Sequence, residues 1–252
     1  MKTNALYYGD NLDILRRYVE SESVDLVYLD PPFSSNKSYN VIFRDESGRA
    51  SDGQILAFED TWHWGPSAEE TYRYLTNTAA HRGAVPDSVS AIIGALRKGI
   101  GTNQMMAYLV EMAVRLVELR RVLKPTAWLA LHCDPTASHY LKLILDAIFD
   151  ARNFRNEIIW RRYGAHNDVG QGSRHFGRVH DVILLYTRDA ASEPKWDQIF
   201  VPLDPKYVEE TYRLVEEDGR RYTTTPLTGP GGAAKGNPVF EWKGHTRAWL
   251  AP

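Results

Sequence analysis

The sequence contains one cysteine, Cys133, in 252 residues. A single thiol cannot build a disulfide framework, so a reducing compartment is expected. The sequence also has no apolar run of the length that a transmembrane helix needs, and its first ten residues lack the apolar centre of a signal peptide. These absences predict a globular protein of the cytoplasm that is not bound to a membrane.

An excess of positive charge is missing as well. The 30 lysines and arginines face 32 acidic residues, for a net charge of −2. This balance excludes a uniformly basic nucleic-acid binder, although it allows a local basic face, because binding follows the distribution of charge. Apolar residues make up 43% of the chain, which is enough for one large domain, alone or with a small second one.

The first thirty residues have the pattern of an α/β unit. Residues 6–8 form a short strand candidate, and residues 11–19 place Leu12, Leu15 and Val19 on one helical face after a cap at Asp10 or Asn11. Residues 24–29 are apolar except for one aspartate, as in a buried parallel strand. A strand, a helix and a second strand in close succession predict an α/β fold.

The rest of the chain continues this alternation as far as about residue 195. Expected helices cover residues 69–75, 88–96, 103–123 and 138–149, and expected strands cover residues 128–131, 157–160 and 182–186. Residues 34–102 are polar, with scattered aromatic residues and glycines, and are interpreted as a helical insertion. We therefore expect a core at residues 1–195 and a second region at residues 196–252, where prolines and glycines accumulate.

The segment Asp30-Pro31-Pro32-Phe33 follows directly on the predicted strand 24–29. In an open α/β sheet, the loops at the carboxyl ends of strands form the ligand crevice. The two prolines stiffen the backbone and offer no N–H, so the segment presents only acceptors: carbonyl oxygens and an ionised carboxylate. A rigid cluster of acceptors suits an exocyclic amino group on a base, on which Phe33 would stack.

The same four residues also fit a plain proline turn after a buried strand. For an isolated tetrapeptide of this kind, the turn is the better interpretation. The preceding buried strand and the wider pattern of the chain favour an active site.

Several segments together resemble the amino-methyltransferases of DNA, in particular the adenine-N6 group with permuted motif order. The segments are LYYGDNLDIL, VDLVYLDPPFSSNKSYNVIF, RVLKPTAWLALHCDPTASHYLKLILDAIF, NFRNEIIWRR, HDVILLYT and WKGHTRAW. The resemblance implies a Rossmann-like core that uses S-adenosylmethionine to methylate N6 of an adenine flipped out of double-stranded DNA. It implies catalytic roles for Asp30, Pro31, Pro32 and Phe33, and cofactor contacts for Asp10 and Asp30.

The resemblance also implies a setting in a prokaryotic or phage restriction-modification or epigenetic system, with a restriction subunit or a second copy as protein partners. Residues 196–252 would begin the region that recognises target DNA. Basic side chains that flank a glycine-rich segment or lie in this region are candidates for phosphate contacts; they are Arg161, Arg162, Arg174, Arg178 and Lys235.

A glycine-rich cofactor turn after a buried strand is absent from the sequence. Only Gly9 precedes Asp30, and the glycine-rich segments 170–177 and 229–236 follow no apolar strand. We therefore expect an N-terminal part of a longer enzyme, with little activity as an isolated chain. Three alternatives stay open: a cytosine-N4 methyltransferase, an RNA base methyltransferase, and an inactive relative that still binds DNA.

Four further side chains invite functional interpretations that we consider weaker than structural ones. His132 and Cys133 lack the partners of a zinc site, so we expect them to end a strand, with Cys133 packed as a small apolar group. Trp62 and Trp64 are expected to pack within the insertion rather than to stack on bases.

Overall fold

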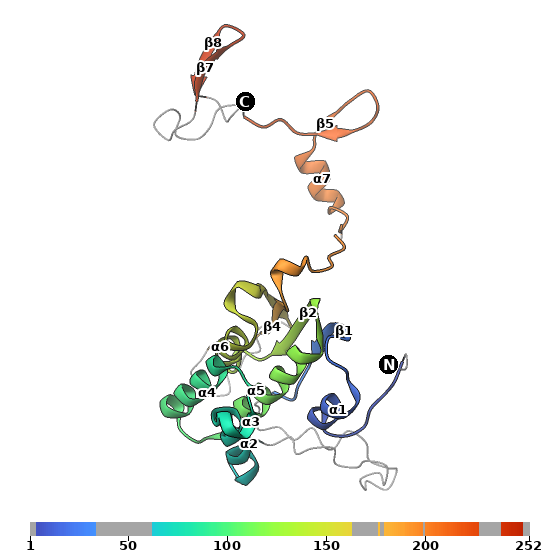
Figure 1. Cartoon of the computed structure of the whole chain (residues 1–252). Coiled ribbons are helices and arrows are strands. Elements are labelled where there is room, and N and C mark those ends of the chain that lie inside the picture. The colour runs from blue at the N-terminus through green and yellow to red at the C-terminus, as the bar shows by residue number, and fades with distance from the viewer. Residues whose placement is uncertain are drawn as a thin grey trace. The chain divides into compact units, whose positions relative to one another are not determined.

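The computed structural model describes residues 4–33, 62–162, 176, 179–198, 200–226 and 238–248. The chain divides into two compact units, residues 1–196 and residues 197–252 (Figure 1). The first unit holds the mixed sheet and most of the helices, and the candidate site lies in it.

The N-terminal unit begins with α1 (Asn11–Tyr18) and β1 (Val24–Leu29), as the sequence predicts. Asp10 caps α1 by accepting a hydrogen bond from the Leu12 amide at 2.8 Å. The strand predicted at residues 6–8 is wrong, because this segment pairs with no strand of the described structure. Tyr7 stacks on Tyr18 of α1 instead, with ring centroids 5.6 Å apart.

A four-stranded sheet with the order β1-β2-β4-β3 forms the centre of this unit. The other strands are β2 (Leu123–Cys133), β3 (Phe154–Arg161) and β4 (His180–Thr187). β2 is parallel to β1, and β4 runs antiparallel to both β2 and β3. The carboxyl ends of β1, β2 and β3 therefore lie along one edge of the sheet.

The helix α5 (Gln104–Val122) lies against this sheet and contributes most to the core. Asn103 starts it by accepting a hydrogen bond from the Met106 amide at 2.9 Å. It ends at Leu123, whose extended backbone leads directly into β2. Two of its methionines, Met106 and Met112, are buried in the core.

The other helices of the unit are α2 (Pro66–Thr76), α3 (Thr78–His81), α4 (Asp87–Ile100) and α6 (Ser138–Phe149). A one-turn 3-10 helix, η1 (Ala151–Asn153), follows α6, and another, η3 (Ala190–Ser192), follows β4. α2 and α4 both contact α5, and α6 contacts α4 and α5, so these helices form one layer beside the sheet (Figure 1).

The segment interpreted as a polar insertion is helical over its described part, residues 62–102, but it is not separate from the core. Leu75, Val89 and Ile93 are fully buried in the same cluster as the side chains of α5. Val89, Ile93 and Leu96 recur at the spacing of one helical face, which α4 buries. This segment therefore contains two amphipathic helices, although its overall composition is polar.

The two faces of the sheet differ. Leu129, Leu131 and Leu184 are buried on the side of the helices. Leu26 and Tyr28 of β1, by contrast, are exposed among the described residues.

The second unit contains α7 (Pro205–Thr211) and two short hairpins, β5 (Leu214–Val215) with β6 (Arg221–Tyr222) and β7 (Val239–Trp242) with β8 (His245–Ala248). Lys243 and Gly244 form the turn of the second hairpin with φ values of 49° and 77°. Two left-handed residues give a turn whose twist matches that of the flanking strands. In the part of the chain that the structure describes, no helix is long and apolar enough to cross a membrane.

Candidate active site

The Asp-Pro-Pro-Phe segment lies where β1 reaches the carboxyl edge of the sheet, beside a hollow of about 430 Å³. The residues that line the hollow come from the end of β1 and this segment, from the start of α1, from α5, and from the first turn of α2 with the residues before it; they are Gly9, Asp10, Asn11, Leu29, Asp30, Pro31, Pro32, Trp62, His63, Ser67, Ala68, Ala107, Glu111, Met112 and Arg115. The fold thus brings Asp10 and Asp30 to one cavity, as the sequence analysis expects of two cofactor contacts.

Among the described residues, Asp30 has one side-chain partner, His132. The Oδ1 atom of Asp30 lies 3.0 Å from Nδ1 of His132, and the aspartate side chain is 60% exposed. Phe33 packs edge-on against the same imidazole, with centroids 5.0 Å apart and the ring planes at 87°. The catalytic segment therefore rests on His132, which lies at the carboxyl end of β2. β2 extends two residues beyond its predicted end, because His132 and Cys133 still pair with β4.

Asp10 lies at the other side of the hollow and is bound by Arg115 of α5. Both of its carboxylate oxygens accept from Arg115 Nη2, at 3.0 and 2.9 Å. The same guanidinium donates to Glu111 Oε2 at 2.7 Å and to Asn11 Oδ1 at 2.8 Å. Asp10 thus closes an ion-pair network that ties α1 to α5, and its carboxylate still borders the cavity.

Trp62 lines the hollow and packs edge-on against Tyr108, with ring centroids 5.2 Å apart. The Trp62 Nε1 and Tyr108 Oη atoms are buried and have no hydrogen-bond partner among the described residues. Burial raises the pKa of Tyr108 strongly. Trp64 packs near Tyr72, with the Arg97 guanidinium 4.9 Å from its ring centroid. Both tryptophans therefore pack as expected, but Trp62 also faces the site.

The family of the chain follows from its match to a known family model. A family model described as DNA methylase, N6_N4_Mtase, matches residues 24–228. The chain belongs to this DNA methylase family. The predictions of a Rossmann-like α/β core and of a DNA amino-methyltransferase family are thereby confirmed.

The chain is also similar to curated Mod subunits and to a type II methyltransferase. The Mod subunit of the type III restriction-modification enzyme StyLTI from Salmonella typhimurium is 24% identical over 258 aligned positions, which cover 99% of this chain and 34% of the relative. The EcoPI Mod subunit of Escherichia phage P1 is 24% identical, covering 93% of this chain and 32% of the relative. The type II methyltransferase M.EcaI of Enterobacter cloacae is 24% identical, covering 96% and 41%. The chain spans about a third of the length of the Mod subunits.

The basic residues proposed for DNA contacts divide into two groups. Arg161 ends β3 and Arg162 follows it, so both lie at the same edge of the sheet as Asp30, and both are exposed. Arg174, Arg178 and Lys235 lie outside the described residues, so their roles stay predictions.

Cys133, the single thiol of this methylase, is buried in the core, as the sequence analysis expects of a small apolar packing residue. Burial raises its pKa to about 12, so the thiol stays protonated at physiological pH. Within the described ranges, no group of three or more His, Cys, Asp or Glu side chains is placed to hold a metal ion.

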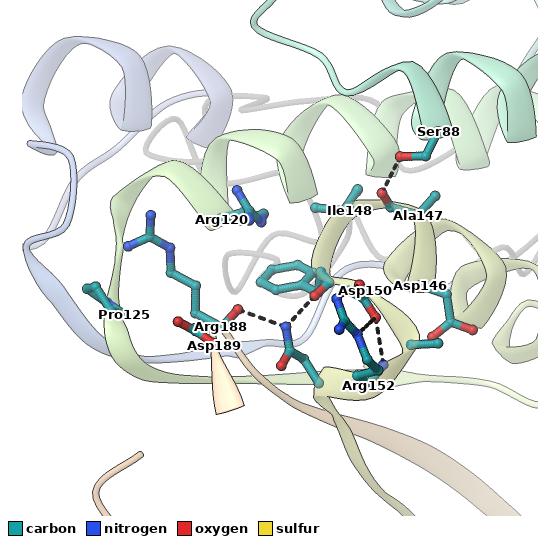
Figure 2. A pocket seen from close by; sticks show the side chains of 13 residues that line it. Ser88, Arg120, Pro125, Asp146, Ala147, Ile148, Asp150, Arg152, Arg188 and Asp189 are labelled. Carbon is teal, nitrogen blue, oxygen red and sulfur yellow. Dashed lines mark hydrogen bonds and ion pairs between the residues drawn. The ribbon is translucent and has the colours of Figure 1, made fainter. Parts of the chain in front are cut away.

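A second and larger hollow, of about 620 Å³, lies at the opposite end of the sheet, near Pro125 of β2 and Arg188 and Asp189 after β4 (Figure 2). Arg120 and Arg188 lie close together there, and burial with the repulsion from Arg188 lowers the pKa of Arg120. Arg188 Nη2 donates to Glu22 Oε1 at 2.6 Å. Nothing from the Asp-Pro-Pro-Phe segment reaches this hollow.

Sequence reasoning missed the contribution of α5 to the candidate site. Glu111 and Arg115 lie on a helix whose apolar spacing marks it as core, and the sequence analysis assigned neither of them to a site. The one available signal was the pair Glu111 and Arg115 at i and i+4 in the helix next to the predicted core. The pairing of His132 with Asp30 has no signal in sequence spacing, because 102 residues separate them.

Proposed function

We propose that this chain provides the catalytic core of a DNA methyltransferase that transfers a methyl group from S-adenosylmethionine to N6 of adenine. The observation that carries the proposal is the position of Asp30 and its two prolines at the carboxyl edge of β1, where they border a hollow large enough for a ligand. This is the edge at which open α/β sheets bind their ligands.

The chemistry follows from the acceptors that the segment presents. The Asp30 carboxylate and the Pro31 carbonyl would each accept a hydrogen bond from the amino group of the target base, which would direct the nitrogen lone pair away from the ring. Holding this nitrogen in line with the methyl group supplies much of the rate enhancement. The nitrogen lone pair forms the new N–C bond as the S–CH3 bond breaks, and its electron pair stays on the sulfur of the departing S-adenosylhomocysteine. The nitrogen then loses a proton, for which the Asp30 carboxylate is an acceptor in place.

The target base must leave the duplex to reach this edge, because stacking and pairing shield its amino group. Phe33 would then contact the extruded base, while His132 supports the phenyl ring from the other side. Arg161 and Arg162, at the same edge, would contact phosphates of the flanking DNA. Asp at the first position of the motif favours adenine, and cytosine N4 is the alternative base.

The hollow also suits the methyl donor. S-adenosylmethionine supplies a methyl group on a cationic sulfonium, together with an ammonium group and an adenine ring. The carboxylates of Asp10, Asp30 and Glu111 line the cavity beside the apolar side chains of Leu29 and Met112. The unpartnered indole N–H of Trp62 adds a buried donor in the same wall. These residues would hold the ligand, together with a glycine-rich turn that we expect outside this chain.

Likeness to Mod subunits suggests the wider setting. We propose that the complete protein is the modification subunit of a restriction-modification system, that it acts on double-stranded DNA, and that it assembles with a restriction subunit or with a second copy. The region from residue 196 onward would begin target recognition.

The deciding experiment compares Asp30→Ala with Asp25→Ala in the full-length gene product. Both aspartates come from the β1 region, but Asp25 is 76% exposed and, within the described part of the chain, pairs with Lys124 at the surface. Mass spectrometry of nucleosides from treated DNA should show N6-methyladenine for the parent and for Asp25→Ala, and none for Asp30→Ala.

Other products would change the conclusion. N4-methylcytosine in DNA would keep the reaction and change the base. Methylated bases only in RNA, or DNA binding without any methylation by the parent protein, would refute the proposed function. Undiminished methylation by Asp30→Ala would remove Asp30 from the site.

A further inference from the structure

Asp181 of β4 is a buried carboxylate close to the candidate site, and its side chain is only 6% exposed. An ionised carboxylate inside a protein requires partners, because burial removes its hydration. Among the described residues its partners are His132, with Nε2 3.4 Å from Asp181 Oδ2, and Arg162, with Nη1 3.4 Å from Asp181 Oδ1. The contact with His132 is longer than a good hydrogen bond, and Nε2 lies buried against the carboxylate.

His132 lies between two carboxylates. Nδ1 faces Asp30 at 3.0 Å, Nε2 faces Asp181 at 3.4 Å, and the side chain is 18% exposed. Because an ionised carboxylate only accepts, Nδ1 serves as the donor to Asp30, while Nε2 faces Asp181 without a hydrogen bond. The edge-on ring of Phe33 further limits rotation of the imidazole.

We propose that His132 is a positioning residue for the reaction, which fixes the Asp30 carboxylate, and that Asp181 with Arg162 fixes His132 in turn. The inference rests on the proposed function, since it assigns His132 to the same site. Asp30 is 60% exposed, and among the described residues its only polar side-chain partner is His132, so this bond selects the orientation of the carboxylate. With Oδ1 bound to His132, Oδ2 is left for the amino group of the base.

The chain of contacts joins all four strands of the sheet at one edge. Asp30 follows β1, His132 lies in β2, Asp181 lies in β4, and Arg162 follows β3, so each strand contributes one member. Arg162 is also proposed to contact DNA. Binding of a phosphate near Arg162 would therefore act on the same contacts that hold Asp30.

Steady-state methylation by the full-length gene product tests the role of His132. We expect His132→Ala to lower kcat by about 10- to 100-fold, because a displacement of ~1 Å at a reacting group can cost about 100-fold. The KM for S-adenosylmethionine and the Kd for DNA should change by less than about threefold, since neither ligand is held by His132. His139→Ala, at an exposed histidine of α6, is the matched control and should retain parental kcat.

Two further variants separate positioning from a merely structural role. The amide nitrogen of asparagine lies near the place of histidine Nδ1, so His132→Asn should recover part of the kcat lost in His132→Ala. Asp181→Asn preserves shape and should also lower kcat. Because Asp181 acts through His132, the double variant should be no slower than His132→Ala alone, which a double-mutant cycle measures.

The outcomes distinguish this inference from the function on which it rests. If Asp30→Ala abolishes methylation while His132→Ala retains parental kcat, the function stands and the positioning role is refuted. Additive losses in the double variant, or a loss confined to KM, would refute it as well. If Asp30→Ala methylates normally, the site and the inference fail together.

Discussion

The two ends of the central sheet carry hollows of different character. The hollow at the carboxyl edge of β1 contains Asp30, an exposed carboxylate with a single side-chain partner among the described residues. The larger hollow at the opposite end contains carboxylates that neighbouring groups already bind. Asp146, for example, accepts from Lys142 Nζ at 2.7 Å and from Tyr186 Oη at 2.7 Å. The larger volume of a hollow therefore does not identify the active site. What identifies it is a carboxylate that has an oxygen left to bind a ligand.

The two ends also differ in how they are stabilised. At the candidate site, Arg115 joins Asp10, Asn11 and Glu111, so one side chain of α5 organises the start of α1. At the far end, Asn153 bridges backbone groups and no ligand is needed to complete its bonding. The predictions that follow test whether activity depends on the end of the sheet with the candidate site, while the far end contributes to stability alone.

The largest effect is expected for Arg115→Met. The change leaves Glu111, which is 18% exposed, without its cation and removes both bonds to Asp10. Breaking a buried pair costs about 3–5 kcal/mol, less here because Asp10 is partly exposed. Urea unfolding should show the loss of stability, and calorimetry should show weaker binding of S-adenosylmethionine to the full-length protein.

Arg152→Met is the matched control for this prediction. Arg152 pairs with Asp150 at the far end, where its side chain is 88% exposed. The stability of Arg152→Met and its affinity for S-adenosylmethionine should stay close to those of the parent. An equal loss of stability in Arg115→Met and Arg152→Met would contradict the proposed difference between the two ends of the sheet.

A smaller effect is expected for Asn153→Ala. Its amide donates to the carbonyls of Phe149 and Arg188 at 2.6 and 3.1 Å and accepts from the Ala190 amide at 2.9 Å. The loss should reduce stability by about 1–3 kcal/mol, because backbone groups lose their partners. Turnover per folded molecule should not change.

Asn156→Ala, at an exposed asparagine of β3, should stay within about 0.5 kcal/mol of the parent. Denaturant titration gives both stabilities, and a methylation assay normalised to folded protein gives the turnover. A fall in kcat for Asn153→Ala would connect the far end to the reaction.

The smallest effect concerns Cys133, whose pKa is raised from 9.0 to about 12 by burial. The unfolded thiol ionises first, so its contribution to stability is complete below about pH 9 and is lost as the pH rises towards 12. At pH 10 the parent should have lost about 1 kcal/mol more stability than Cys133→Ala. Urea midpoints at pH 8 and pH 10 measure this difference, and equal losses would contradict it.

Much of the fold follows from local patterns. The apolar run of residues 24–29 fixes β1, the spacing of Leu141, Leu145 and Ile148 fixes α6, and Asn103 fixes the start of α5 by capping it. The strand expected at residues 6–8 failed because a strand also needs a neighbour to pair with, and no local pattern supplies one. The helices at residues 66–76 and 87–100 were expected, but their place in the main core was not.

The candidate site divides in the same way. The sequence by itself determined that an acceptor segment, Asp30 to Phe33, follows a buried strand, because proline chemistry and apolar runs are local properties. Only the tertiary structure decided that His132, Asp181 and Arg115 would meet this segment or its cavity. Their partners lie on separate strands and helices, and the order and direction of the strands in the sheet bring them together.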